Sequence, residues 1–129
     1  MQPRLTNTYS QNSLGSNIEK VIRVEYQKPL NLITVRGSSI GDYSSHKYER
    51  LVEIITDHLK MSNSLQLYFN FDFLDSSALA YLATIISTLN EFHSKGKMIK
   101  LHWSVLSVAD NMSDEGEKLK ALSSFEFYK

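Results

Sequence analysis

The 129-residue sequence has no cysteine, two prolines, five glycines and one tryptophan. Without thiols it forms no disulfide and has no thiolate chemistry, so a zinc site would need histidines and carboxylates alone. No apolar run approaches the roughly 20 residues that cross a bilayer, and the first residues lack the pattern of a signal peptide. We therefore expect a cytoplasmic protein without membrane insertion.

The charges show no excess of either sign. Fourteen Lys and Arg residues balance fourteen Asp and Glu residues, which gives a formal net charge of zero. A protein that binds nucleic acid through a broad basic face needs an excess of cations to offset the phosphates. The composition therefore argues against nucleic acid as a partner.

The N-terminal stretch differs in composition from the remainder of the chain. Residues 1–17 are rich in Gln, Asn, Ser and Thr and contain few side chains that a core would bury. We expect a flexible tail there, with Leu5 or Leu14 as candidates for docking onto the domain. Residues 18–129 are enough for one hydrophobic core, which predicts a single domain.

Hydrophobic periodicity predicts strands that alternate with helices. Apolar residues at every second position indicate strands, and a spacing near 3.6 residues indicates helices. The first two strands are expected to form a hairpin, broken at Lys28-Pro29, and turn-forming residues predict a loop at 37–42. The later alternation favours parallel pairing with right-handed crossovers, hence an α/β fold. The strands are expected at 22–26, 30–35, 65–73 and 98–106, and the helices at 43–60, 78–95 and 117–122.

Asp75-Ser76-Ser77 lies where the third predicted strand gives way to a helix. The simplest interpretation is an N-cap, worth about 1 kcal/mol, which satisfies free N–H groups of the first helical turn. The alternative is a phosphoacceptor serine, because a phosphate at a helix N-terminus meets the positive end of the dipole. The same charge, beside Asp72 and Asp75, would oppose a docking partner. These residues alone favour the cap and leave the switch open.

Other chemistry finds little support in the sequence. The serine corner lacks the Gly-x-Ser-x-Gly of a nucleophile elbow. The acidic segment that starts at Asp110 has Met112 at the third position of a calcium loop and Ala121 at the twelfth, so it does not match an EF-hand. Asp114 followed by Glu117 instead predicts an acid-capped helix start. The four histidines show no metal-binding spacing, so we expect no metal and no cofactor; they are His46, His58, His93 and His102.

The residues from Leu74 to Ala80 resemble the signature corner of STAS domains, the anti-sigma-factor antagonist family, whose first serine is phosphorylated. That serine corresponds to Ser76. Residues 98–103, which end in Trp103, and the acidic residues 110–117 that follow resemble the SiaC family of STAS-like regulatory phosphoproteins. Gly37-Ser38-Ser39 before a tyrosine-containing helix resembles the proximal motif of that family, and the similarity covers about residues 18–127. The resemblance implies a STAS-like mixed sheet of about four strands with helices mainly on one face.

The sequence departs from the SiaC pattern at the corner. SiaC-like proteins usually carry Asn-Thr-Ser-Ser where this chain has Leu74-Asp75-Ser76-Ser77. If the family's acceptor is the Thr position, Asp75 places a permanent negative charge there. Two interpretations then remain open: Ser76, with Ser77 as the alternative, is the remaining acceptor, or the switch is lost.

The resemblance implies a non-enzymatic signalling switch. In its unphosphorylated form, the protein would dock a partner through the corner and nearby side chains. A serine/threonine kinase would release the partner and a PP2C-type phosphatase would restore it. The first implied partner is a diguanylate cyclase in cyclic-di-GMP signalling; the alternatives are an anti-sigma-factor kinase or a structural or ligand-binding STAS module without phosphorylation. The expected partner-binding residues are Tyr43, Tyr48, Asp72, Asp75, Ser76 and Ser77.

Overall fold

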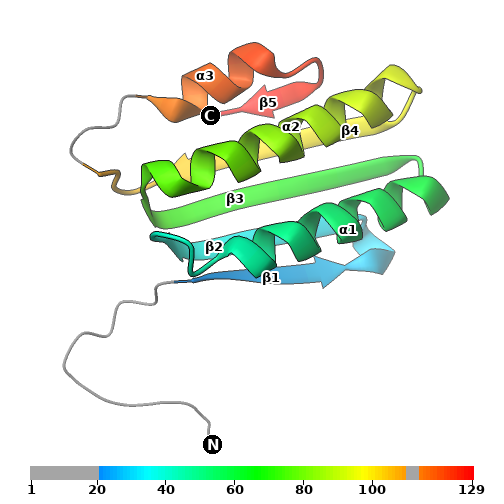
Figure 1. The fold of residues 1–129 in the computed structure, drawn as a ribbon. Helices are drawn as coiled ribbons and strands as arrows, with labels where there is room; N and C mark the ends of the chain where they lie inside the picture. Colours follow the sequence, from blue (N-terminus) through cyan, green and yellow to red (C-terminus); the bar gives the residue numbers. More distant parts are fainter. Residues whose placement is uncertain (1–20, 110–113) are drawn as a thin grey trace, which may run out of the picture.

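The computed structural model describes residues 21–109 and 114–129, and a five-stranded sheet forms its centre (Figure 1). The strands follow one another across the sheet in chain order. β1 and β2 pair antiparallel, whereas the later neighbours pair parallel, which confirms the predicted hairpin and the parallel pairing after it. The strands are β1 (Ile22–Gln27), β2 (Leu32–Ser39), β3 (Ser64–Leu74), β4 (Met98–Val105) and β5 (Glu126–Tyr128).

Helices α1 and α2 lie across the same face of the sheet (Figure 1). They bury apolar stripes, such as Leu51 and Ile55 in α1, against the alternate buried residues of β3, such as Leu67 and Phe69. The expected α/β fold with helices mainly on one face is confirmed. Within the described residues, no helix combines the length and apolar content needed to cross a membrane. The helices are α1 (Ser45–Met61), α2 (Leu79–Ser94) and α3 (Glu115–Leu122), with 3-10 turns η1 (Lys28–Leu30) and η2 (Ser76–Ala78).

The C-terminal stretch forms a strand that hydrophobic periodicity did not predict. Phe127 of β5 pairs with Leu101 of β4, and Phe125 and Phe127 are buried. The observed sheet has five strands, one more than the expected four, because this short segment docks beside β4. The tail expected at residues 1–17 lies outside the described residues, so the boundary at residue 18 stays a prediction.

Strand β2 continues through residues that were expected to form a loop. Ser38 and Ser39 pair with Phe73 and Leu74 of β3, although Gly, Ser and Ser are typical turn formers. The register between the two strands shifts at Gly37, whose φ is +111°. A Cβ at Gly37 would lie 3.0 Å from the Val21 carbonyl oxygen, so a residue without a side chain suits this irregular position of the strand. The prediction that β2 ends at residue 35 was therefore wrong.

The starts of α1 and α3 also differ from expectation. Ser44 precedes α1, but its hydroxyl accepts a hydrogen bond from Ile22 N at 3.0 Å and makes no cap bond to the helix. This contact ties the start of α1 to β1. Asp114 accepts a hydrogen bond from Glu117 N at 3.1 Å, which confirms the acid cap, although α3 already begins at Glu115.

Candidate functional site

The candidate site is formed by two loops at one edge of the sheet. Because β2 and β3 are parallel neighbours, their carboxyl ends meet at the same edge. After β2 comes the Gly41 loop, residues 40–44, and after β3 comes the corner, residues 75–78. The Asp75 amide donates a hydrogen bond to the Ser39 carbonyl oxygen at 3.1 Å, which joins the corner to the end of β2.

The Asp75 carboxylate connects these two loops. Its Oδ2 accepts a hydrogen bond from the Gly41 amide at 2.8 Å, and its Oδ1 accepts one from the Ser77 amide at 3.0 Å. The Ser77 hydroxyl lies 2.6 Å from the Gly41 carbonyl oxygen and also contacts Asp75 Oδ1, so its single proton serves one of these acceptors at a time. The predicted N-cap is confirmed, and the same carboxylate also clamps the Gly41 loop.

The clamp keeps Asp75 charged. Burial opposes the ionised form, but hydrogen bonds from the Ser77 hydroxyl and from the Gly41 and Ser77 amides outweigh it, so the pKa of Asp75 lies below its ordinary value. Both carboxylate oxygens are occupied by donors from the chain itself. Asp75 therefore acts as an internal cap, and its charge is largely taken up by these donors.

The charge of Asp75 is expected to contribute to stability at neutral pH and to lose that contribution in acid. Because its folded-state pKa is lowered, the unfolded chain binds the extra proton first as the pH falls. Asp75→Asn keeps a good N-cap residue but removes the charge. We expect it to lower the free energy of unfolding by about 0.5 kcal/mol at neutral pH, since solvent screens this site. The stability difference between the wild type and Asp75→Asn should shrink once the pH falls below about 4, and it should vanish below the lowered pKa of Asp75.

Chemical denaturation between neutral and acid pH measures this difference. Asp72→Asn is the matched control, because it removes an exposed carboxylate that has no hydrogen bond within the described residues. Because Asp72 makes no such bond, Asp72→Asn should change the free energy of unfolding by clearly less than Asp75→Asn does. If Asp75→Asn lowered the free energy of unfolding by the same amount down to strongly acid pH, the charge of Asp75 would contribute nothing to stability.

The two serines of the corner differ in their surroundings. The Ser76 side chain is exposed, and its hydroxyl has no hydrogen-bond partner within residues 21–109 and 114–129. The Ser77 side chain is half-buried and its hydroxyl is held between Gly41 and Asp75. A hydroxyl that must leave a hydrogen-bonded site is a poorer acceptor for a phosphoryl group than one that is already free. The geometry therefore favours Ser76 over Ser77.

The two tyrosines assigned to partner binding have opposite environments. The Tyr43 side chain is 60% exposed, and its ring lies 3.8 Å from the position that a Cβ on Gly41 would take. Tyr48 is only 1% exposed; its hydroxyl donates to Ser39 Oγ at 2.8 Å. Burial raises the pKa of Tyr48 to about 12, against the effect of the Ser39 hydrogen bond. The assignment of Tyr48 as a partner-binding residue is corrected: it supports the site from the core.

Removal of the Tyr48 hydroxyl is expected to cost about 1 kcal/mol of folding free energy, because Ser39 Oγ then remains buried without its donor. Tyr48→Phe tests this by chemical denaturation. Tyr81→Phe is the control, since Tyr81 stacks on Tyr48 at 5.3 Å between ring centroids but has no hydroxyl hydrogen bond within the described residues. Equal losses for the two variants would contradict a specific role for the Tyr48–Ser39 bond.

Asp72 is not part of the clamp. It is exposed and lies on the opposite face of β3 from the buried Phe71, at the point where the register between β2 and β3 shifts. Within the described residues, no hydrogen bond or ion pair joins it to the corner. Its expected role in partner binding stays a prediction that rests on charge alone.

The structure adds residues that the sequence did not indicate. Gly41, with a φ of +57°, presents its amide and carbonyl to the corner. The segment after β4 runs beside the end of β3, where the Leu74 amide donates to the Ser107 carbonyl oxygen at 3.1 Å. Leu106 and Val108 of this segment are 81% and 37% exposed, and they line a hollow of about 630 Å³. Apolar side chains are thus exposed at the same edge of the sheet as the corner.

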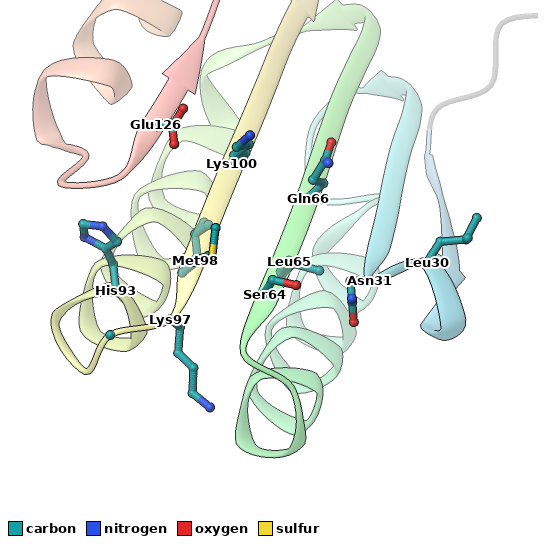
Figure 2. Close-up of a pocket in the computed structure, with 12 residues that line it drawn as sticks. Leu30, Asn31, Ser64, Leu65, Gln66, His93, Lys97, Met98, Lys100 and Glu126 are labelled. Carbon is teal, nitrogen blue, oxygen red and sulfur yellow. The ribbon is translucent and has the colours of Figure 1, made fainter.

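A second hollow, of about 460 Å³, lies at the opposite end of the strands (Figure 2). Figure 2 shows Gln66, Lys100 and Glu126 projecting from the neighbouring strands β3, β4 and β5. Leu30 and Met98, each 65% exposed, supply its apolar part. Within the described residues, no group of three or more His, Asp or Glu side chains is placed to hold a metal ion. This hollow holds none of the residues predicted for the site.

Comparison with known proteins gives one family and one fold. The sequence model of the family described as "SiaC family regulatory phosphoprotein" matches residues 17–129. The structure of SiaC of Pseudomonas aeruginosa superposes with a TM-score of 0.70 at 17% identity, covering 95% of this chain and 98% of that one. SiaC in the crystal structure of diguanylate cyclase SiaD in complex with its activator SiaC, from the same organism, gives a TM-score of 0.69 at 18% identity, covering 88% and 93%. Curated protein sequences gave no match.

Proposed function

This chain belongs to the SiaC family of regulatory phosphoproteins, and we propose that it is a non-enzymatic cytoplasmic switch that binds and activates a diguanylate cyclase while its corner is unphosphorylated. A serine/threonine kinase adds a phosphate to Ser76 and releases the cyclase. A PP2C-type phosphatase reverses the modification. The structure of SiaC in complex with the cyclase SiaD supports this choice of partner, because that SiaC has the same fold.

The observation that carries the proposal is the state of the Ser76 hydroxyl. It is exposed, lacks a hydrogen-bond partner within the described residues, and stands at the start of η2, which leads into α2. A phosphate there meets the positive end of the helix dipole. Exposed apolar side chains at the same edge, among them Tyr43 and Leu106, supply area for docking a protein.

Phosphorylation in vitro tests the acceptor. The purified protein is incubated with the cognate kinase and ATP, and its intact mass and modified residue are determined by mass spectrometry. We expect one phosphate, on Ser76, in the wild type and in Ser77→Ala, and none in Ser76→Ala. A phosphate on Ser77, or no phosphate at all, would contradict the proposed acceptor.

A second candidate function uses the same corner with another partner. The Asp75-Ser76-Ser77 sequence resembles the corner of anti-sigma-factor antagonists, and its carboxylate is bound as a cap. In that function the unphosphorylated protein binds an anti-sigma-factor kinase and so frees a sigma factor. Recovery of the partner from the native lysate on immobilised wild-type protein and on Ser76→Asp distinguishes a cyclase from such a kinase.

A further inference from the structure

We propose that Asp75 is a positioning residue that holds the Gly41 loop, and with it Tyr43, in the arrangement that the partner binds. Phosphate on Ser76 then acts by loosening this clamp. The inference rests on the proposed function for the partner and the phosphate, whereas the clamp itself is a feature of the structure.

The corner holds Gly41 through both its amide and its carbonyl group. Its amide donates to Asp75 Oδ2 at 2.8 Å, and its carbonyl oxygen lies 2.6 Å from the Ser77 hydroxyl. Gly41 lies 34 residues from Asp75 and 36 residues from Ser77 in the chain, so these are long-range contacts. The Gly41 loop has a turn of its own, in which Ser45 N donates to Asp42 O at 3.1 Å, but this bond does not attach it to the sheet. Ser44 anchors the far end of the loop to β1, where its hydroxyl accepts a hydrogen bond from Ile22 N at 3.0 Å, so Asp75 and Ser77 hold the Gly41 end.

Tyr43 is coupled to this clamp by its position. It follows Gly41 by two residues, and its ring packs beside Gly41. The residue is 60% exposed, and tyrosines are among the residues most enriched in binding interfaces. Tyr43 is therefore suited to contact a partner. A shift of Gly41 away from the corner moves the ring with it. Asp75 is largely shielded by its own donors, so its effect on a partner passes through the loop.

A phosphate on Ser76 weakens the clamp by charge. It adds a charge of about −1.5 to −2 on the residue next to Asp75. Two anions at one helix start repel each other and compete for the same amide donors, those of Gly41 and Ser77. The dianion is the stronger competitor, so Asp75 is expected to lose its bond to Gly41. The phosphate then changes the docking surface beyond its own position.

The clamp can be tested without any partner. We expect the Gly41 amide resonance to shift, and its hydrogen exchange to accelerate by about tenfold, in Asp75→Asn and on phosphorylation of Ser76. Ser77→Ala keeps the Asp75–Gly41 bond and should show a smaller change, and Asp72→Asn should show none. Phosphorylated protein whose Gly41 amide is unchanged would overturn this inference and leave the proposed function standing. Absence of phosphorylation or of cyclase binding would instead overturn the proposed function.

A double-mutant cycle tests the route through Tyr43. We expect Asp75→Ala and Tyr43→Ala each to weaken cyclase binding by about tenfold, or about 1.4 kcal/mol. If Asp75 acts by placing the ring, the double variant should bind no more weakly than Tyr43→Ala alone. Additive losses would show that Asp75 acts on the partner by another route. Circular dichroism confirms that each variant is folded before binding is compared.

Discussion

Phosphorylation of Ser76 is expected to weaken cyclase binding by at least about tenfold, which corresponds to about 1.4 kcal/mol. The unmodified hydroxyl is exposed and bonds to no described residue, so the docked state needs no rearrangement at this position. A phosphate places about two negative charges beside Asp75 and must be desolvated or excluded when the partner approaches. Titration calorimetry of the cyclase with unmodified and phosphorylated protein measures the change.

Substitutions at Ser76 provide the controls. Ser76→Ala should bind like the unmodified protein, because the hydroxyl makes no contact that the substitution removes. Ser76→Asp should bind more weakly, but less so than the phosphorylated protein, since it carries one charge on a shorter side chain. The loss should become smaller at high salt, where surface charges are screened. Equal binding by Ser76→Ala and Ser76→Asp would favour a STAS module without phosphorylation.

The long elements of the fold were predictable from single residues and their spacing. β3 alternates from Leu65 to Phe73, and this pattern alone places its buried face. Two features were not predictable in this way. Three residues of β5 are too few to show a period, and they are held by pairing with β4. The Gly37–Ser39 segment has the composition of a turn, and it becomes a strand through pairing with β3 and, at Gly37, with β1.

In the candidate site, too, local contacts were predictable from the sequence and long-range contacts were not. The cap by Asp75 is a local interaction with Ser77, two residues away, so the sequence was enough to predict it. The bond to Gly41 depends on the parallel packing of β2 against β3, which no local pattern reports. Tyr48 has the helical spacing of the buried Leu51 and Ile55, which indicates a core position, although it was also expected on the partner surface. The structure places the side chain in the core, where it is 1% exposed.

Gly116→Ala is expected to destabilise the protein by about 1–3 kcal/mol, although alanine favours helices over glycine by about 1 kcal/mol. Gly116 lies in α3, where a Cβ would lie 2.6 Å from Trp103 Nε1 and 2.8 Å from its Cδ1. The indole is 9% exposed and packs edge-on against Phe71, at 5.5 Å between ring centroids. Either the indole or α3 must therefore shift to accommodate the methyl group. Chemical denaturation followed by far-UV circular dichroism measures the loss, because this signal also serves a background in which the one tryptophan is replaced.

The sign of this effect separates packing from helix propensity. In an open helix position, replacement of glycine by alanine stabilises a protein, so a gain for Gly116→Ala would show that α3 does not pack against Trp103 as described. Trp103→Phe supplies the matched background, because its smaller ring leaves space for the added methyl group. In that background Gly116→Ala should cost less than in the wild type, or even stabilise, and the coupling energy should be about 1 kcal/mol or more. Identical costs in both backgrounds would place the origin of the effect elsewhere than at the contact between Gly116 and the indole.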